Sequence, residues 1–523
     1  MSDKFSNPTS KAFGTNRERK SSILFHVMPS RKNKETKRAT MSSQNLSERA
    51  TKDAFHGIIQ IYGDKHGDQL LGIAEKLDNL WMKMEGEKME KLNINKPRQK
   101  VNVLFVGNHS AGKSSFINWY VGGKPVCAES QAQETRSYCF VTYGKKEMDV
   151  VGESTLMKFD YIKNITDKFD ETISNYMRTS VVDRDSNAFK FVDLIDSPGL
   201  VGAAREGQSG GNVQKYEFDI DNSLMYIAER CDLVYVFLDN HGGATQMRTI
   251  EVYKKLINLA REKKCFELHT FLTKIDQVQS TKDLMNLHGS IQSELSENVK
   301  QNSPSDGHQD LGFAFRLKNL FVPNEQRLKM VDPEIKKMND IEEANRIIVE
   351  AIKAKVSKNF EILKHDCKKL GDRRAALVEI NKAHVAKRDF RATLSSVIYV
   401  GAFSIAVYMF ICVAIGIRSY LPKNIAESAV YEILVEAAKP LVASYADHSY
   451  FENTKVALVL FFTFYVLCFL ARMLKTRASL YPIFSSDDKN FVQDVDNRVN
   501  AFLEEKERLH RSYLEDPVDD IKR

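Results

Sequence analysis

The chain has 523 residues, of which 43% are apolar and 28% are charged. At roughly 100 to 200 residues per domain, this length allows two to four domains; the composition excludes a wholly disordered chain and a polytopic membrane protein. The net charge of +7 is accounted for by residues 1–50, which hold eleven basic and four acidic side chains. The remainder is neutral overall, so we expect no nucleic-acid partner.

Residues 1–50 are predicted to form a disordered basic arm, because a stretch rich in Ser, Lys and Arg cannot bury enough apolar area to fold alone. Its longest apolar run, Ile23–Phe25, is too short for a signal peptide, whereas a transit peptide remains an alternative. The seven cysteines show no metal-ligand spacing and are interpreted as reduced thiols.

Residues 51–96 are predicted to be an N-terminal helical segment that ends at Lys96-Pro97, because proline cannot continue a helix. Its apolar side chains recur at helical spacing and share one face: Leu70, Ile73, Ala74, Leu77, Leu80, Trp81 and Met84.

Residues 97–330 alternate short β-rich runs with helical ones, which predicts an α/β fold: a mostly parallel sheet with helices on both faces. The predicted strands are Val101–Val106, Tyr138–Tyr143, Phe189–Ile195, Leu233–Leu238, Glu267–Leu272 and Leu320–Val322.

A long amphipathic helix is predicted for residues 331–393, with apolar side chains at helical spacing from Ile341 to Leu363. Two interpretations fit this pattern equally: a stalk that leads away from the α/β domain, or a helix that packs back on it.

Two uncharged runs predict a membrane hairpin. Residues 394–417 can cross a hydrocarbon core of about 30 Å. The second uncharged run, 456–471, is shorter, but Arg472 can snorkel and Met473 and Leu474 extend the apolar face, so the second span is predicted at 456–474. Basic residues are denser outside the spans than in the loop 418–455, which favours cytosolic placement of both the N-terminal part and a tail at 475–523. The alternative is a buried helix pair in a soluble domain.

A phosphate-binding motif follows the first predicted strand. The sequence from Gly107 to Ser114 fits G-x-x-x-x-G-K-[ST], in which glycines let backbone N–H groups surround phosphates, the lysine neutralises them and the serine binds Mg²⁺. The candidate nucleotide-binding residues in this loop are Gly107, Ser110, Ala111, Gly112, Lys113, Ser114 and Ser115.

Two later strands end in residues that complete such a site. Asp196 can reach Mg²⁺ through water, and the amide of Gly199 can meet the γ-phosphate. Thr273, Lys274 and Asp276 form a TKID motif, in which the carboxylate accepts two N–H bonds from guanine and the lysine stem packs over the base. Three such strands in one sheet predict a G domain with its nucleotide at their carboxyl edge.

Thr135, just before the strand at Tyr138, is the candidate switch threonine that closes over Mg²⁺ and the attacking water, and an ordinary strand-entry residue is the alternative. Ser114, Thr135 and Asp196 are therefore the candidate metal ligands. We interpret His109 as an exposed loop histidine rather than a base.

The motifs SAGKSS, DSPGL and TKID resemble those of the dynamin superfamily of large GTPases. Over roughly residues 60–365 the sequence is similar to the G domains of EH-domain-containing ATPases and of sarcalumenin. The resemblance implies a transition-state role for Ser110, phosphate and Mg²⁺ binding by Lys113 and Ser114, and switch roles for Thr135, Asp196 and Gly199. His109 stands where dynamins have a glutamine, and Glu134 and Arg136 also depart from the family pattern.

These features predict a nucleoside triphosphatase, with GTP favoured over ATP, anchored in an intracellular membrane with its G domain facing the cytosol. We expect self-assembly through the G domain and stalk, with Mg²⁺ as cofactor, and membrane tethering or remodelling. The alternatives are an EH-domain-protein-like ATPase, a non-catalytic sarcalumenin-like protein and a slow signalling switch.

Overall fold

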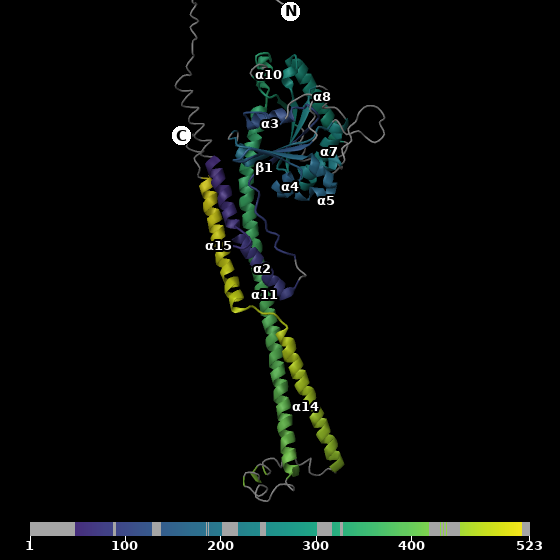
Figure 1. Ribbon diagram of the computed structural model, residues 1–523, viewed down its shortest axis with the longest axis vertical. Coiled ribbons are helices and arrows are strands. Elements are labelled where there is room, and N and C mark those ends of the chain that lie inside the picture. Colours follow the sequence, from purple (N-terminus) through teal and green to yellow (C-terminus); the bar gives the residue numbers. More distant parts are fainter. Residues whose placement is uncertain are drawn as a thin grey trace, which may run out of the picture.

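The computed structural model describes residues 48–514 apart from gaps at 87–89, 128–136, 185, 187, 201–217, 241–246, 301–315, 325–327 and nearly all of 418–449. An α/β domain sits at one end of an elongated molecule, and one long helix, α11, runs from this domain to the opposite end (Figure 1). Other helices pack along α11 over most of its length.

The α/β domain contains an eight-stranded mixed sheet of order β3-β4-β2-β5-β1-β6-β7-β8. Its strands pair in parallel except β2 with β5 and β3 with β4. The predicted mostly parallel sheet is thus confirmed. The strands are β1 Val101–Gly107, β2 Tyr138–Tyr143, β3 Met148–Val151, β4 Met177–Val182, β5 Val192–Asp196, β6 Leu233–Asp239, β7 Glu267–Thr273 and β8 Leu317–Leu320.

Two of the predicted strands are wrong in their extent. Residues 189–191 form a 3₁₀ turn, η3 Phe189–Phe191, because Ala188 has a left-handed φ of 58° and turn hydrogen bonds precede β5. The last strand is Leu317–Leu320 rather than residues 320–322. The strands β3 and β4 were missed altogether.

Helices cover both faces of the sheet, as predicted. Alternate residues of β1 show this arrangement: Val103 and Phe105 face one apolar core, while Leu104 and Val106 face another. The first core contains side chains of α3 and α11, and the second contains those of α4, α6, α7 and α8. The helices of the domain are α3 Lys113–Val121, α4 Glu153–Lys158, α5 Thr166–Phe169, α6 Ile220–Ala228, α7 Met247–Lys263, α8 Thr281–Lys300 and α10 Pro333–Lys337, with 3₁₀ turns η1 Asp160–Ile165, η2 Glu171–Tyr176 and η5 Ile275–Gln277.

The N-terminal segment forms two helices, at 48–62 and at α2 Leu70–Glu85. The apolar face predicted for α2 is buried, from Leu70 to Met84. The helix ends earlier than predicted, at Gly86, whose φ of 79° is a conformation that glycine adopts without a steric penalty. The Lys96-Pro97 pair lies in an extended segment instead.

The helix α11 Ile341–Ile417 has 77 residues and combines both interpretations of the predicted stalk. At 1.5 Å per residue it spans about 115 Å. Its first part packs on the G domain, where Ala344 O accepts a hydrogen bond from Tyr235 Oη and Asn359 Nδ2 donates to Arg98 O. The rest leaves the domain and runs beside α2, α15 and α14 (Figure 1).

The C-terminal helices pack along α11 at different heights. Helix α14 Tyr450–Ser479 lies beside its far part, whereas α15 Ser486–Leu514 turns back toward the G domain beside α2 and α11. Val492, Val495 and Val499 of α15 are buried in this bundle. The segment expected to be a tail therefore contributes a helix to the stalk.

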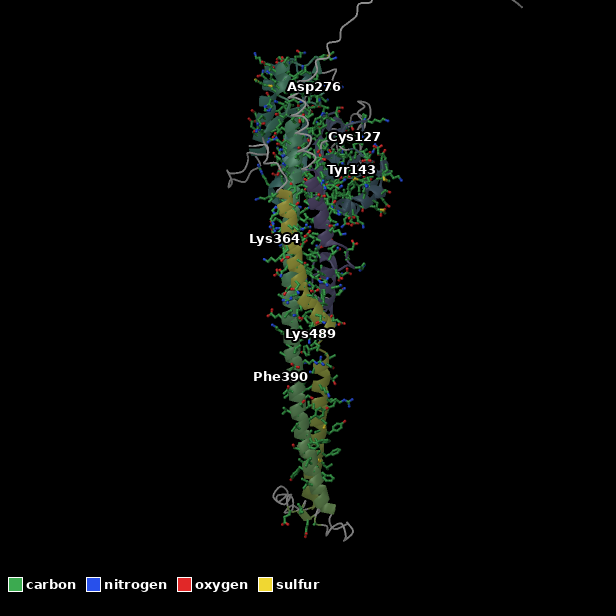
Figure 2. The ribbon with its side chains drawn as sticks, turned by 90° about the vertical axis from the view of Figure 1, so that its left-hand side faces the viewer. Cys127, Tyr143, Asp276, Lys364, Phe390 and Lys489 are labelled. Carbon is green, nitrogen blue, oxygen red and sulfur yellow. The ribbon has the colours of Figure 1, made fainter. Side chains whose placement is uncertain are left out.

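Two helical segments are long and apolar enough to cross a membrane. The part of α11 up to Ile411 contains a window of mean hydropathy 2.0, and Ala457–Ser479 contains one of 2.2. Large apolar side chains such as Phe403 and Phe462 are about 70% and 68% exposed in the chain alone. Figure 2 shows the order along the long axis, with Asp276 in the G domain, Lys489 at the start of α15 and Phe390 just before the apolar part.

Candidate nucleotide-binding site

The loop after β1 adopts a tight anion-cradling conformation. A Cβ on Gly107 would lie 2.4 Å from Phe237 O, so only glycine fits where β1 passes β6. Ser110 and Gly112 have φ values of 56° and 93°, and α3 begins at the next residue, Lys113. The loop therefore directs the N-terminus of α3 toward the carboxyl edge of the sheet, where backbone N–H groups attract anions.

Lys113 lies inside this loop and is only 5% exposed. Its Nζ donates to Gly107 O at 3.1 Å and to Asn108 O at 3.0 Å. Burial lowers the pKa of the ammonium, and attraction to Asp196 opposes this shift. The two carbonyl dipoles compensate the positive charge of Lys113 only partly. The negative charge of a triphosphate in the loop would compensate it better.

Asp196 and Ser114 meet beside Lys113. Ser114 Oγ donates to Asp196 Oδ2 at 2.5 Å. Asp196 is fully buried, and within the described part of the chain its Oδ1 has no hydrogen-bond partner. Burial raises the pKa of this carboxyl, whereas Lys113 and the Ser114 hydrogen bond lower it. A hydroxyl and a buried carboxylate with a free oxygen are donors that suit Mg²⁺, so the residues present fit the expected cation.

The segment after β5 is fastened to the phosphate loop. Ser197 N donates to Phe105 O at 3.2 Å, and Leu200 N donates to Gly107 O at 3.3 Å. A Cβ on Gly199 would lie 2.5 Å from His109 Nδ1, so the imidazole packs directly on this glycine. His109 is thus half-buried against Gly199, and its interpretation as an exposed loop histidine is wrong.

The TKID motif lies at the carboxyl end of β7, beside the phosphate loop. Thr273 Oγ1 donates to Ala111 O at 2.7 Å, so this hydroxyl ties β7 to the loop. Lys274 is left-handed, with φ 57°, and Asp276 follows it in η5. Figure 2 shows Asp276 at the end of the molecule far from Phe390.

The sequence-predicted residues therefore come together, with one outside the described chain. Ser110 is exposed at the mouth of the loop, and Ser115 is half-buried in the first turn of α3. Thr135 falls within 128–136, outside the described residues. The candidate residues thus come from the ends of β1, β5 and β7, as a nucleotide at the carboxyl edge requires.

Two further residues at this edge were missed by sequence reasoning. Asn108 Oδ1 accepts from Thr249 Oγ1 at 2.8 Å, which connects the phosphate loop with α7. Asn240 Nδ2 donates to Lys274 O at 3.0 Å. Asn108 occupies a variable position of the motif, and Asn240 follows a strand end without a motif of its own. The one sequence signal for Asn240 is its position just after a predicted strand, at the edge of the sheet where the nucleotide is expected.

The family model described as the dynamin family matches residues 103–261. A bacterial dynamin pair, solved as an oligomer, is 13% identical with a TM-score of 0.34, over 88% of this chain and 80% of that chain. A bacterial selenocysteine-specific elongation factor is 14% identical with a TM-score of 0.25, over 49% of this chain and 29% of that chain. A probable GTP-binding protein, engB, is 15% identical with a TM-score of 0.25, over 48% of this chain and 99% of that chain. The family match spans the phosphate loop and Asp196, so residues 103–261 of this chain are similar to the G domain of the dynamin family.

Proposed function

We propose that the protein is a membrane-anchored, dynamin-type GTPase that couples nucleotide hydrolysis to self-assembly and to membrane tethering or remodelling. One observation carries the proposal: a site in which Ser114 donates to Asp196 and the buried Lys113 is attracted to the same carboxylate lies in a domain at one end of a continuous 77-residue helix whose other end is apolar. A soluble switch protein has no need for such a helix.

In this proposal the phosphates lie against the N-terminus of α3. Lys113 would exchange its two backbone acceptors for phosphate oxygens. Ser114 and Asp196 would hold Mg²⁺, which would supply charge neutralisation at the transferred phosphoryl group. Ser110, Thr135 and Gly199 would complete the catalytic edge, with Thr135 and Gly199 responding to the γ-phosphate.

Guanine recognition is assigned to Asp276, since a carboxylate can accept from both N1–H and the 2-amino group of that base. The second candidate is an ATPase of the kind found in EH-domain-containing proteins, which the sequence resemblance favours. Competition binding with GTP and ATP decides between them, and tighter ATP binding would contradict the guanine assignment.

The site and the membrane are connected by α11, whose first part is fixed to the G domain by the hydrogen bonds of Tyr235 and Asn359. We propose that the apolar parts of α11 and α14 form a hairpin in an intracellular membrane and that the G domain faces the cytosol. The cationic side chains at the G-domain side of these spans favour that orientation: Lys382, Lys387, Arg388, Arg391, Arg472, Lys475 and Arg477.

The test is turnover of GTP and ATP by purified full-length protein in detergent and in liposomes, with vesicle clustering measured in parallel. We expect GTP turnover that rises with protein density on the membrane, and clustering that requires hydrolysable nucleotide. Lys113→Ala is the control and should lose both. Intact turnover that is independent of protein concentration, with no clustering or shape change, would favour the signalling alternative instead.

A further inference from the structure

The turn that carries Asp276 has an unfavourable backbone conformation. Lys274 adopts φ 57° and ψ 32°, a left-handed region that a residue with a Cβ rarely occupies without support. The three residues after it form η5, so the conformation of Lys274 sets the direction in which the chain delivers Asp276. Any group that holds Lys274 in place therefore also positions the carboxylate.

Asn240 is such a group. It follows β6 directly, and Asp239 at the end of β6 pairs in parallel register with Thr273 at the end of β7. The two chains thus leave the sheet side by side, and Asn240 Nδ2 donates to Lys274 O at 3.0 Å. On the other side of the same turn, the hydroxyl of Thr273 is tied to Ala111 O of the phosphate loop.

We propose that Asn240 is a positioning residue for nucleoside recognition: its amide holds the left-handed turn at Lys274, and this turn presents Asp276 to the N1–H and 2-amino edge of guanine. The inference rests on the proposed guanine-binding function and adds to it the residue that orients the recognition group. Asn240 itself need not touch the base.

The matched variants are Asn240→Asp and Asn359→Asp. Each replaces an amide by a carboxylate of the same shape and so removes a donor to a backbone carbonyl. Asn359 Nδ2 donates to Arg98 O at 2.9 Å, where α11 packs on the G domain, and its Oδ1, like that of Asn240, is buried and unpaired within the described residues. The two sites differ chiefly in their distance from the nucleotide edge.

The experiment uses full-length protein in detergent and measures dissociation constants for Mg²⁺ complexes of GTP, of ITP, which lacks the 2-amino group, and of inorganic tripolyphosphate. In Asn240→Asp we expect GTP binding to weaken about tenfold, the size expected for one lost buried hydrogen bond with repulsion in its place. The preference for GTP over ITP should fall with it, while tripolyphosphate binding stays unchanged. Asn359→Asp should leave the GTP-to-ITP ratio at the parental value.

A second background keeps the test decisive. Glycine adopts the left-handed conformation freely, so Lys274→Gly should make the turn independent of Asn240. Lys274→Gly should itself weaken GTP binding, because the lysine stem that packs over the base is lost. In the Lys274→Gly background, however, adding Asn240→Asp should change the ratio of GTP to ITP affinity by less than about threefold. Asn240→Ala replaces Asn240→Asp in both backgrounds if the carboxylate prevents folding.

A parental protein that discriminates GTP from ITP, together with folded Asn240 variants that keep the same ratio, would overturn the role of Asn240 alone. Equal weakening of GTP and tripolyphosphate would overturn it too, because a general structural defect would explain both losses. A parental protein that binds GTP and ITP equally, or ATP more tightly than GTP, would instead overturn guanine recognition by Asp276, and the role of Asn240 with it.

Discussion

A buried ion pair joins the G domain to the long helix, and breaking it should uncouple the two. Lys355 of α11 is 7% exposed, and its Nζ lies 2.7 Å from Oδ1 of Asp232, whose side chain is 15% exposed. Asp232 Oδ2 also accepts from Asn102 N at 3.0 Å, at the start of β1. Burial lowers the pKa of Lys355, while attraction to Asp232 opposes that shift.

Replacing Asp232 by alanine leaves the ammonium of Lys355 buried without a counter-ion and leaves Asn102 N–H without its acceptor. We expect a loss of about 3–5 kcal/mol in the free energy of unfolding, the range for one removed partner of a buried pair. Replacing both partners, as Asp232→Ala with Lys355→Met, removes the unpaired charge. The double variant should therefore lose less than the sum of the single ones, by about 2 kcal/mol.

The assay is urea unfolding of the full chain in detergent, followed by tryptophan fluorescence. The chain has two tryptophans, Trp81 in α2 and Trp119 in α3, so Trp81→Phe and Trp119→Phe backgrounds report the G domain and the stalk separately. Nucleotide binding at low temperature should survive, because Asp232 lies at the amino end of β6 and the candidate site at the carboxyl end. A loss below about 0.5 kcal/mol for Asp232→Ala, typical of an exposed substitution, or strict additivity in the cycle, would refute the reasoning.

Four further outcomes are expected. Thr135→Ala should bind GTP normally and lose single-turnover hydrolysis, and hydrolysis at the parental rate would rule out its switch role. Asp276→Asn should shift preference from guanine toward xanthine in competition binding, because the carboxylate becomes an amide with a donor of its own. Affinity for Mg²⁺-GTP should fall as the pH is lowered, because protonation of Asp196 removes a ligand of the cation. Burial raises the pKa of Asp196 above the ordinary aspartate value of 3.8, so the fall should begin at a higher pH than for an exposed aspartate. Binding measured between pH 8 and 5 at constant ionic strength checks this. Val495→Asp should release α15 to limited proteolysis, because it buries an unpaired charge, whereas Gln493→Asp on the exposed face of the same helix should not.

The sequence by itself determined the local parts of this protein. The phosphate loop, the aspartate that ends β5 and the TKID turn could be predicted, because a few neighbouring residues with fixed backbone requirements define each one. The long amphipathic helix and the two apolar runs were equally readable, since their periodicity and length are properties of one continuous segment.

The edge strand β3 and its neighbour β4 were not predicted, because their pairing depends on the tertiary structure rather than on a local sequence pattern. Most of the β3 side chains are exposed, so no apolar alternation marks the strand, and its pairing with β4 creates it. Asn108 and Asn240 were not predicted either, since each gains its partner from an element distant in sequence: Thr249 of α7 for Asn108, and Lys274 in the turn after β7 for Asn240.

Only the tertiary structure decided what the C-terminal segment does. Val492, Val495 and Val499 make α15 amphipathic, but an apolar face does not specify which other face covers it. In the folded chain Lys83 of α2 pairs with Asp488 at 2.7 Å, and Arg374 of α11 pairs with Asp496 at 2.8 Å. A chain that ended at Arg391 would therefore lose part of its stalk together with its two apolar helical segments, because packing between segments some 400 residues apart, rather than chain order, completes the bundle.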